Sequence, residues 1–247
     1  YDETNVNGTQ IVIDTCMQLK IPRLVYTSTI DVVMDSVHGH LGGDESLPYP
    51  PDPRRMNRYA YSKMLGEQMV LKANSPALAT CALRPAGMFG PGDKYHLPNI
   101  IKNAKHGVNI CLGDGTAQFS HVFCGNVAHA HVLASEKLAP DSPAAGQAYF
   151  ITDGHDRNFF SFMEPFLQAL GIPLPKMSIP YGAANAMAWL IEKVSPKSNL
   201  NRFSVYCTCL DHTFTHAKAT RDFGYEPRYS HEEAFEITLE WLKTQEF

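Results

Sequence analysis

The sequence predicts an α/β fold in which helices cover a parallel sheet. A largely apolar run over residues 23–29 is typical of a strand buried in such a sheet. Apolar residues at helical spacing over 5–19 come before this run, and a second helical pattern over 59–74 is followed by another strand pattern at 78–84. With 247 residues, 44% of them hydrophobic, the chain is long enough for one large domain or for a domain with a smaller lobe.

The remaining elements follow from the same patterns. Residues 31–58 hold several glycines and four prolines and therefore predict a long loop, which in a compact domain is usually functional. The segment from Pro85 to Leu97 is expected to turn away from the sheet. Beyond it we predict helices at 98–106, 125–137 and 158–170, strands at 109–112, 119–123 and 146–151, and Pro-rich turns with helices after 172. Ser230-His231-Glu232-Glu233 is a capping box for the last helix.

Composition excludes some classes of function. The net charge is −4 without a basic cluster, which argues against nucleic-acid binding. The six cysteines are scattered, and Cys16, Cys81 and Cys124 lie in apolar patterns, so we expect reduced, buried thiols in a reducing compartment. Cys207 and Cys209 alternate along a strand-like run but have no partner pair of matching spacing, and the eleven histidines form no cluster, so no metal site is predicted.

Residues 181–194 form the most apolar stretch between two prolines, but no run reaches the roughly 20 apolar residues that span a bilayer. A core or lid helix is the main interpretation of this stretch. The alternative is an interfacial helix with Trp189 at headgroup level, flanked by Lys193 and Lys197. We therefore expect a cytoplasmic protein, with peripheral membrane contact through 181–194 as the alternative.

Tyr59 and Lys63 are the candidate acid–base pair. They stand four residues apart on a predicted helix and so share one face of it, whereas Tyr61 does not. A free tyrosine titrates near ~10, and a fixed positive charge beside it favours the phenolate. An isolated pair of this kind is more often a half-buried tyrosine next to a solvated lysine, so the interpretation depends on its surroundings.

Several segments in fixed order supply those surroundings. They are Asn5-Val6-Asn7-Gly8-Thr9, residues 24–29, 43–49, 59–63 and 83–92, Gly125-Asn126-Val127-Ala128, residues 149–153 and residues 223–227. Together they resemble the extended short-chain dehydrogenase/reductases, and more narrowly the 3β-hydroxysteroid dehydrogenase/isomerase family with its sterol-4-carboxylate dehydrogenase relatives. The resemblance implies a Rossmann-like doubly wound parallel sheet over 1–170 and a smaller, mostly helical substrate-binding lobe over 171–247.

The resemblance also implies roles for the polar residues. Tyr59 would be the general acid/base, and Lys63 would lower its pKa and bind the nicotinamide ribose. Thr29 would hold the substrate oxygen with its hydroxyl, while the adjacent Ser28 either shares that role or points into the packing. Asn5 would complete a proton relay through water, or alternatively cap a helix.

Two further groups are expected near the site. Backbone atoms of Pro85, Ala86 and Gly87 would meet the nicotinamide amide, although a tight turn after a strand is a sufficient explanation of this sequence. Ile30, Met88 and Phe89 would form apolar walls for a flat hydrophobic substrate, with a core role for the last two equally open. The expected cofactor is NAD, with NADP as the alternative, and the expected reaction is oxidation of a 3β-hydroxyl of a steroid or sterol.

One part of the family pattern is missing from the sequence. No G-x-G-x-x-G stands between a strand and a helix, so we expect the first βα units, roughly 60–90 residues, to be absent and the sheet to be N-terminally incomplete. The strand at 24–28 would then have an unpaired apolar edge, and NAD would bind weakly. The alternatives are a reductase of flavonoid or sugar-nucleotide carbonyls, and a non-catalytic homologue that only binds a lipophilic ligand.

Overall fold

A three-stranded parallel sheet lies at the centre of the protein. The computed structural model describes residues 1–94, 97–105, 110–175, 177–195 and 200–246. The strands β1 (Arg23–Thr27), β3 (Ala79–Pro85) and β7 (Gln147–Ile151) are hydrogen-bonded in the order β1-β3-β7, and both pairings are parallel. The predicted α/β fold with a parallel sheet is confirmed.

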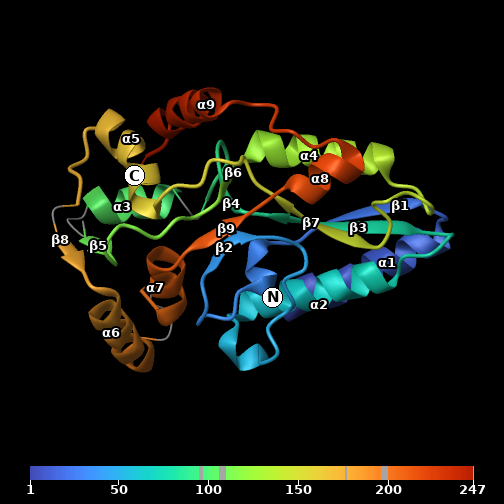
Figure 1. The fold of residues 1–247 in the computed structure, drawn as a ribbon, viewed down its shortest axis with the longest axis horizontal. Coiled ribbons are helices and arrows are strands. Elements are labelled where there is room, and N and C mark those ends of the chain that lie inside the picture. The colour runs from blue at the N-terminus through green and yellow to red at the C-terminus, as the bar shows by residue number, and fades with distance from the viewer. Residues whose placement is uncertain (95–96, 106–109, 176, 196–199, 247) are drawn as a thin grey trace.

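Helices cover both faces of this sheet (Figure 1). α1 (Gly8–Gln18) and α2 (Arg58–Lys72) lie against one face, and α4 (Cys124–Lys137) and α8 (Ala217–Phe223) against the other. This arrangement is the doubly wound one, in which ligands bind beyond the carboxyl ends of the strands.

The burial of the strands differs from the prediction at β1. Every residue of β3 is buried, but all five residues of β1 are partly or fully exposed, so the expectation of a buried strand at 23–29 is wrong in this respect. The cause is position: among the described residues β1 pairs with β3 on one side only. The apolar edge expected at 24–28 is therefore present in the structure.

Three further parallel strand pairs extend the structure. β2 (His40–Gly43) pairs with β9 (His212–Phe214), β4 (Gly87–Phe89) with β6 (His121–Phe123), and β5 (Ile110–Leu112) with β8 (Met177–Ile179). The prediction that 31–58 form a loop is therefore wrong in part. This segment contains β2 and the short 3-10 helix Pro53–Arg55, and it begins within another, Ile30–Val33. The partner of β2 lies far away in the sequence, where no local pattern reveals it.

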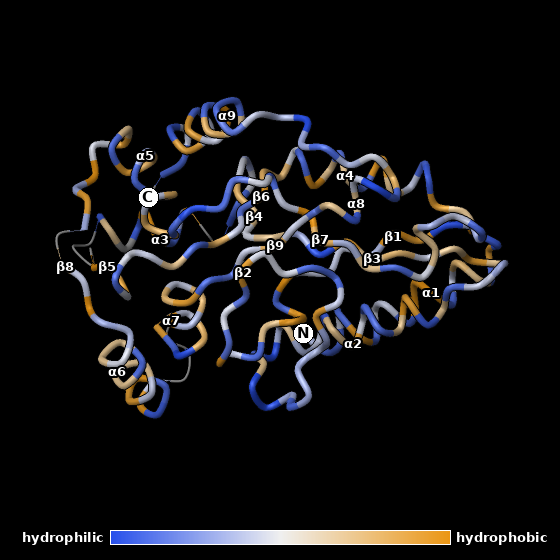
Figure 2. The backbone as a smooth tube through the Cα atoms, viewed as in Figure 1, coloured by the Kyte–Doolittle hydropathy of each residue, from blue (hydrophilic) through white to orange (hydrophobic). Residues whose placement is uncertain are grey.

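Four of the remaining helices lie close to their predicted positions: α3 (Leu97–Lys105), α5 (Phe159–Ala169), α6 (Tyr181–Val194) and α9 (His231–Lys243). The fifth, α7 (Arg202–Cys209), includes the run that the sequence predicted to be strand-like. The capping box at Ser230 and Glu233 is confirmed, and Figure 2 shows hydrophobic and hydrophilic residues alternating along α9. Three predicted positions lie outside the described residues: His106 at the end of a predicted helix, Asn109 at the start of a predicted strand, and Lys197 beside the apolar stretch.

Two predictions about cysteines need correction. Cys207 and Cys209 lie on α7 and not on a strand, because Asn201 and Ser204 form a capping box that starts a helix there. Cys124 is only partly buried, at the start of α4, whereas Cys16 and Cys81 are buried as expected. All six cysteines are free thiols.

The hydrophobic interior has two main clusters. The larger surrounds the sheet, and the second, rich in phenylalanine, joins α3 and α5 to α9. Residues on both sides of position 170 contribute to each, since α8 packs on β7 and Ala234 joins the second cluster. The division into 1–170 and 171–247 remains a prediction.

A buried ion pair fastens α2 to β3. Arg84 donates from Nη2 to Glu67 Oε1 at 2.6 Å and from Nε to both carboxylate oxygens at 3.0 and 3.1 Å. The phenol of Tyr49 donates to the same Oε1 at 2.6 Å. The side chains of Arg84 and Glu67 are 5% and 0% exposed, so neither charge can be left to water if its partner is lost.

We expect Arg84→Met to lower the free energy of unfolding by about 3–5 kcal/mol, because it leaves the Glu67 carboxylate buried without its counter-ion. Urea unfolding followed by circular dichroism measures this. Arg58→Met is the matched control, since Arg58 pairs with Asp2 at the surface and surface pairs contribute little. An equal, small effect of both substitutions would contradict a structural role for the buried pair.

Candidate active site

Three predicted residues gather near the carboxyl end of β1. Thr29 begins the short 3-10 helix Ile30–Val33, where its Oγ1 accepts the Asp31 backbone N–H at 3.3 Å. Asn57 caps α2 by accepting the Ala60 N–H at 2.7 Å, which places Tyr59 in the first turn of that helix. Lys63 follows one turn later on α2.

The phenol of Tyr59 is held in its protonated form. Burial, together with the Asp31 carboxylate and Tyr1, raises the pKa of Tyr59 to about 12, and a hydrogen bond with the Thr29 side chain offsets this only in part. The Tyr1 ring lies edge-on to Tyr59, with centroids 5.6 Å apart. The expected lowering of this pKa by Lys63 is not what the structure shows, since Lys63 is absent from the groups that shift it.

Lys63 makes other contacts instead. Its Nζ donates to the Thr27 carbonyl at 2.5 Å and lies 4.4 Å from the centroid of the Tyr26 ring. Burial lowers the pKa of the Lys63 ammonium, and the Glu67 carboxylate opposes that effect. The Lys63 ammonium is therefore bonded to the end of β1, and among the described residues no hydrogen bond joins it to the Tyr59 phenol.

Asn5 and Ser28 occupy distinct environments. Asn5 lies in a π-helical turn, Glu3–Asn7, and its Nδ2 donates to Ser62 Oγ at 2.9 Å, so its side chain does not cap a helix. Ser62 lies on α2 between Tyr59 and Lys63 and donates to the Tyr59 carbonyl at 2.8 Å. Ser28 is buried, and its Oγ has no hydrogen-bond partner among the described residues.

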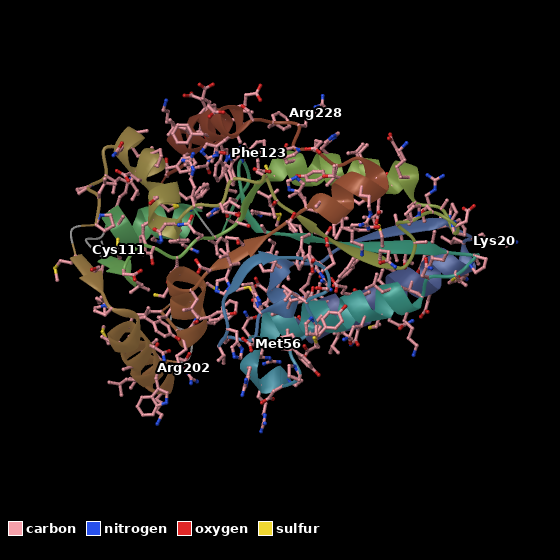
Figure 3. The ribbon with its side chains drawn as sticks, viewed as in Figure 1. Lys20, Met56, Cys111, Phe123, Arg202 and Arg228 are labelled. Carbon is pink, nitrogen blue, oxygen red and sulfur yellow. The ribbon has the colours of Figure 1, made fainter. Side chains whose placement is uncertain are left out.

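Two cavities are lined in part by these residues. The first, about 440 Å³, lies between α1 and β1 and includes Asn5, Thr27 and Lys63 in its lining. The second, about 950 Å³, is called the cleft below. Its lining comprises Tyr1, Asp31, Asp35, Ser36, Val37, residues 54–59, Tyr181, Asn185, Glu192 and residues 201–203. Figure 3 labels Met56 and Arg202, which line this cleft from different elements. Lys63 borders only the first cavity and Tyr59 only the second.

The turn after β3 is tied into the sheet. Ala86 N–H donates to the Ile151 carbonyl at 3.0 Å and Gly87 N–H to the Ser120 carbonyl at 3.1 Å, so both amides are already occupied. A Cβ at position 87 would lie 2.6 Å from Phe119 Cε1, which explains the glycine. Backbone contact of Pro85, Ala86 and Gly87 with a nicotinamide stays a prediction.

Of the three residues predicted to form apolar walls of the site, two lie in the core and one is exposed. Ile30 and Phe89 are each 2% exposed and belong to the two core clusters, so neither lines a described cavity. For Phe89 the core alternative is the one that the structure shows. Met88 is 47% exposed, which rules out the core alternative for that residue.

Sequence reasoning missed Asp31. Burial raises the pKa of its carboxyl to about 6, and a hydrogen bond with the Thr29 side chain acts in the opposite direction. The only signal in the sequence is its position, two residues after Thr29. Among the residues that the structure describes, no group of three histidines, cysteines or carboxylates could hold a metal ion.

Solved structures with the same architecture define the class of fold. A dTDP-glucose 4,6-dehydratase from Bacillus anthracis, in complex with NAD, superimposes with a TM-score of 0.71 at 18% identity over 99% of this chain and 69% of that chain. A UDP-glucuronic acid 4-epimerase from Bacillus cereus, in complex with UDP-glucuronic acid and NAD, gives 0.73 at 17% identity over 98% and 68%. The fold is thus the Rossmann-like fold of such enzymes.

Sequence comparison shows the family. The model of the 3-beta hydroxysteroid dehydrogenase/isomerase family matches residues 1–181, and the chain belongs to this family. It is 38% identical over 250 residues to 3beta-hydroxysteroid-dehydrogenase/decarboxylase isoform 1 of Arabidopsis thaliana, which covers 96% of this chain and 56% of the relative. It is 37% identical over 262 residues to short-chain dehydrogenase/reductase family 42E member 1 of Homo sapiens, which covers 98% and 65%. The chain therefore spans between about half and two thirds of the length of these relatives.

We expect Thr29→Ala to reduce turnover more than Ser28→Ala. Thr29 bonds to the Asp31 N–H and interacts with the Tyr59 phenol, whereas the Ser28 hydroxyl is buried and has no partner among the described residues. Steady-state kinetics of both variants under one assay, in a protein of the length of the relatives, decide the order. A larger loss for Ser28→Ala would move the substrate-binding hydroxyl to Ser28.

Proposed function

We propose that this chain is the catalytic part of an NAD-dependent oxidoreductase that oxidises the 3β-hydroxyl of a steroid or sterol-like substrate to a ketone. One observation carries the proposal: Tyr59 and Lys63, one helical turn apart on α2, each line a cavity, and the Tyr59 phenol lies beside Thr29. This arrangement suits a dinucleotide and a substrate that meet at a shared acid–base group. Membership of the family supports the substrate class.

The residues around the first cavity fit the nicotinamide ribose. Lys63 Nζ has three donors, one of which is used by the Thr27 carbonyl, so the remaining donors are suited to ribose hydroxyls. Asn5 lines the same cavity. The pyrophosphate end of a dinucleotide has no counterpart here, because the sequence lacks a glycine-rich turn before a helix. When bound, NAD or NADP would supply the acceptor for the hydride of the substrate carbon.

Tyr59 and Thr29 would handle the alcohol. The Thr29 hydroxyl would hold the substrate oxygen in the cleft, and Tyr59 would take the proton that the alcohol loses. Positioning of this kind converts a bimolecular proton transfer into one within a preformed complex. Lys63 would act through the cofactor ribose, since it contacts the end of β1 and not the Tyr59 phenol.

A second candidate substrate class is favoured by the lining of the cleft. Arg54, Arg55, Arg58 and Arg202 border it, which suits a substrate with an anionic part such as a sugar nucleotide. Each of these arginines also lies within 4.0 Å of a carboxylate, so the cleft is not strongly cationic. Parallel assays with a 3β-hydroxysteroid and with UDP-glucose separate the two classes.

We expect Tyr59→Phe to lower the rate of 3β-hydroxysteroid oxidation by roughly 10²–10⁴-fold, the usual contribution of general acid–base catalysis. Phenylalanine keeps the ring and loses the proton-transfer group. Tyr61→Phe is the matched control, because Tyr61 lies two positions along α2 and packs on the core. Equal rates in Tyr59→Phe and in the control would contradict the role of Tyr59 as general acid/base. They would favour a protein that binds its ligand without turnover.

α6 forms one wall of the cleft and exposes an apolar outer surface. Only Ala184 and Ala188 are buried on it, while Met187, Trp189, Leu190 and Val194 are exposed, and Lys193 Nζ lies 3.7 Å from the Trp189 ring centroid. Within the described residues, no helix is both long and apolar enough to span a bilayer. We propose that α6 lies at a membrane surface, where a tryptophan with a flanking lysine is favoured.

Replacing both Trp189 and Leu190 by Ser is expected to reduce co-sedimentation with phosphatidylcholine–phosphatidylserine vesicles several-fold. The double Ser substitution at Ile11 and Val12, exposed apolar residues of α1, serves as control. Equal sedimentation of both double variants and the unsubstituted protein would contradict membrane contact through α6.

A further inference from the structure

A buried serine joins two segments of the chain beside the first cavity. Ser62 lies on α2 between Tyr59 and Lys63 and is fully buried. Its Oγ accepts from Asn5 Nδ2 at 2.9 Å and donates to the Tyr59 carbonyl at 2.8 Å. Ser62 therefore connects the helix that carries the candidate acid–base residue to Asn5, which lines the first cavity.

The backbone of Asn5 is held in place. Its N–H donates to the Tyr1 carbonyl at 2.7 Å, and its own carbonyl accepts from Thr9 Oγ1 at 2.8 Å. A Cβ at position 66 would lie 2.5 Å from the Asn5 carbonyl oxygen, so Gly66 lets the π-helical turn Glu3–Asn7 pack closely against α2. With this backbone fixed, the contacts of the Asn5 carboxamide are decided by the partners of its two ends.

The direction of the hydrogen bonds fixes which end of this carboxamide meets Ser62. A backbone carbonyl can only accept, so the single hydroxyl proton of Ser62 is used by the Tyr59 carbonyl. The Ser62 oxygen can then only accept from Asn5, which requires the NH2 end of the amide. With the amide reversed, Asn5 Oδ1 and the Tyr59 carbonyl would compete for one proton, and one of the two bonds would be lost. The network thus leaves Oδ1 as the end that faces away from Ser62.

Asn5 and Lys63 bring complementary groups to the first cavity. The Lys63 ammonium can only donate, and one of its three donors is used by the Thr27 carbonyl. Oδ1 of Asn5 can only accept, and within the described ranges no hydrogen bond joins it to another residue. A sugar hydroxyl both donates and accepts, so it suits this pair. An ether or phosphate oxygen only accepts and would leave Oδ1 without a donor.

We propose that Ser62 is a positioning residue that makes the first cavity selective for the hydroxyl groups of a ribose. It holds the NH2 end of the Asn5 carboxamide, so that Oδ1 is available to a hydroxyl that in turn accepts from Lys63. Ser62 itself contacts no ligand and acts through Asn5. The inference rests on the proposed function for the assignment of this cavity to the nicotinamide ribose.

The selectivity is tested by binding, without turnover. The 247-residue chain, labelled with ¹⁵N, is titrated with nicotinamide riboside and with its 2′,3′-di-O-methyl ether, and binding is followed by NMR of the backbone amides. The ether oxygens accept hydrogen bonds but donate none. We expect the riboside to bind more tightly than the ether. In Ser62→Ala this affinity ratio should fall by roughly 3–10-fold, the usual net contribution of one hydrogen bond, because the amide is free to turn.

Two controls separate positioning from packing. Ser135→Ala should leave the ratio unchanged, because Ser135 makes the same bond to a carbonyl three residues earlier on α4 and does not line the cavity. Ser62→Thr keeps the hydroxyl and should keep the ratio. A packing defect at position 62 would weaken both ligands alike and would not move the ratio. If Ser62→Ala does not fold, Ser62→Cys takes its place with the same expectation, since a thiol is a weak hydrogen-bonding group.

A double-mutant cycle shows whether Ser62 acts through Asn5. The ratio should already be low in Asn5→Ala, and adding Ser62→Ala should change it no further. A ratio that Ser62→Ala leaves unchanged overturns the positioning role, and so does a further fall when it is added to Asn5→Ala. An unsubstituted chain that binds no riboside overturns the hydroxyl site itself.

Failure of the proposed function is distinguishable from failure of this inference. Oxidation of a 3β-hydroxysteroid is measured separately, in a protein of the length of the relatives. If the affinity ratios change as expected but no steroid is oxidised, the positioning role of Ser62 stands and the proposed activity fails. If the steroid is oxidised but the ratio does not respond to Ser62→Ala, the activity stands and the positioning role fails.

Discussion

The ion pair between Glu67 and Arg84 is the constraint on which the site depends. Glu67 lies one helical turn beyond Lys63 on α2, and Arg84 lies one residue before the turn that begins at Pro85. Both are buried, and the phenol of Tyr49 joins them from the 31–58 segment. Because an unpaired charge in this interior is costly, the helix, the strand and the segment that walls the cleft hold one another in a single arrangement.

In this arrangement α2 contributes residues to two cavities. Tyr59 and Lys63 stand at i and i+4 and would share a helix face, yet they border different spaces, because the Lys63 ammonium is held by the Thr27 carbonyl. Asn5 reaches the same helix through Ser62, between the two residues. The candidate acid–base residue and the lysine proposed to bind the ribose are thereby held one turn apart on one helix, near the carboxyl end of a strand, where parallel sheets bind their ligands.

Features set by local sequence were predicted well. The apolar pattern and the Asn57 cap define α2, and the Ser230–Glu233 box defines α9, because these signals act within one or two helical turns. Features that depend on contacts between residues far apart in the sequence were not predicted. β2 exists only because β9 pairs with it from the C-terminal part of the chain. The alternation of Cys207 and Cys209 resembled a strand, but the cap at Asn201 outweighs it.

The electrostatics of the site could not be predicted from sequence for the same reason. Residue spacing placed Lys63 near Tyr59 and suggested a lowered pKa, but the shift depends on burial and on the nearest charge, and here that charge is Asp31. Desolvation favours the neutral forms of Tyr59, Asp31 and Lys63. It raises the pKa of Tyr59 and Asp31 and lowers that of Lys63. Because Asp31 titrates far below Tyr59, its carboxylate is a weaker base than the phenolate but is much more populated at neutral pH. The protonation of these groups is therefore set by burial and by the charges that the fold brings near them, and residue spacing along one helix determines neither.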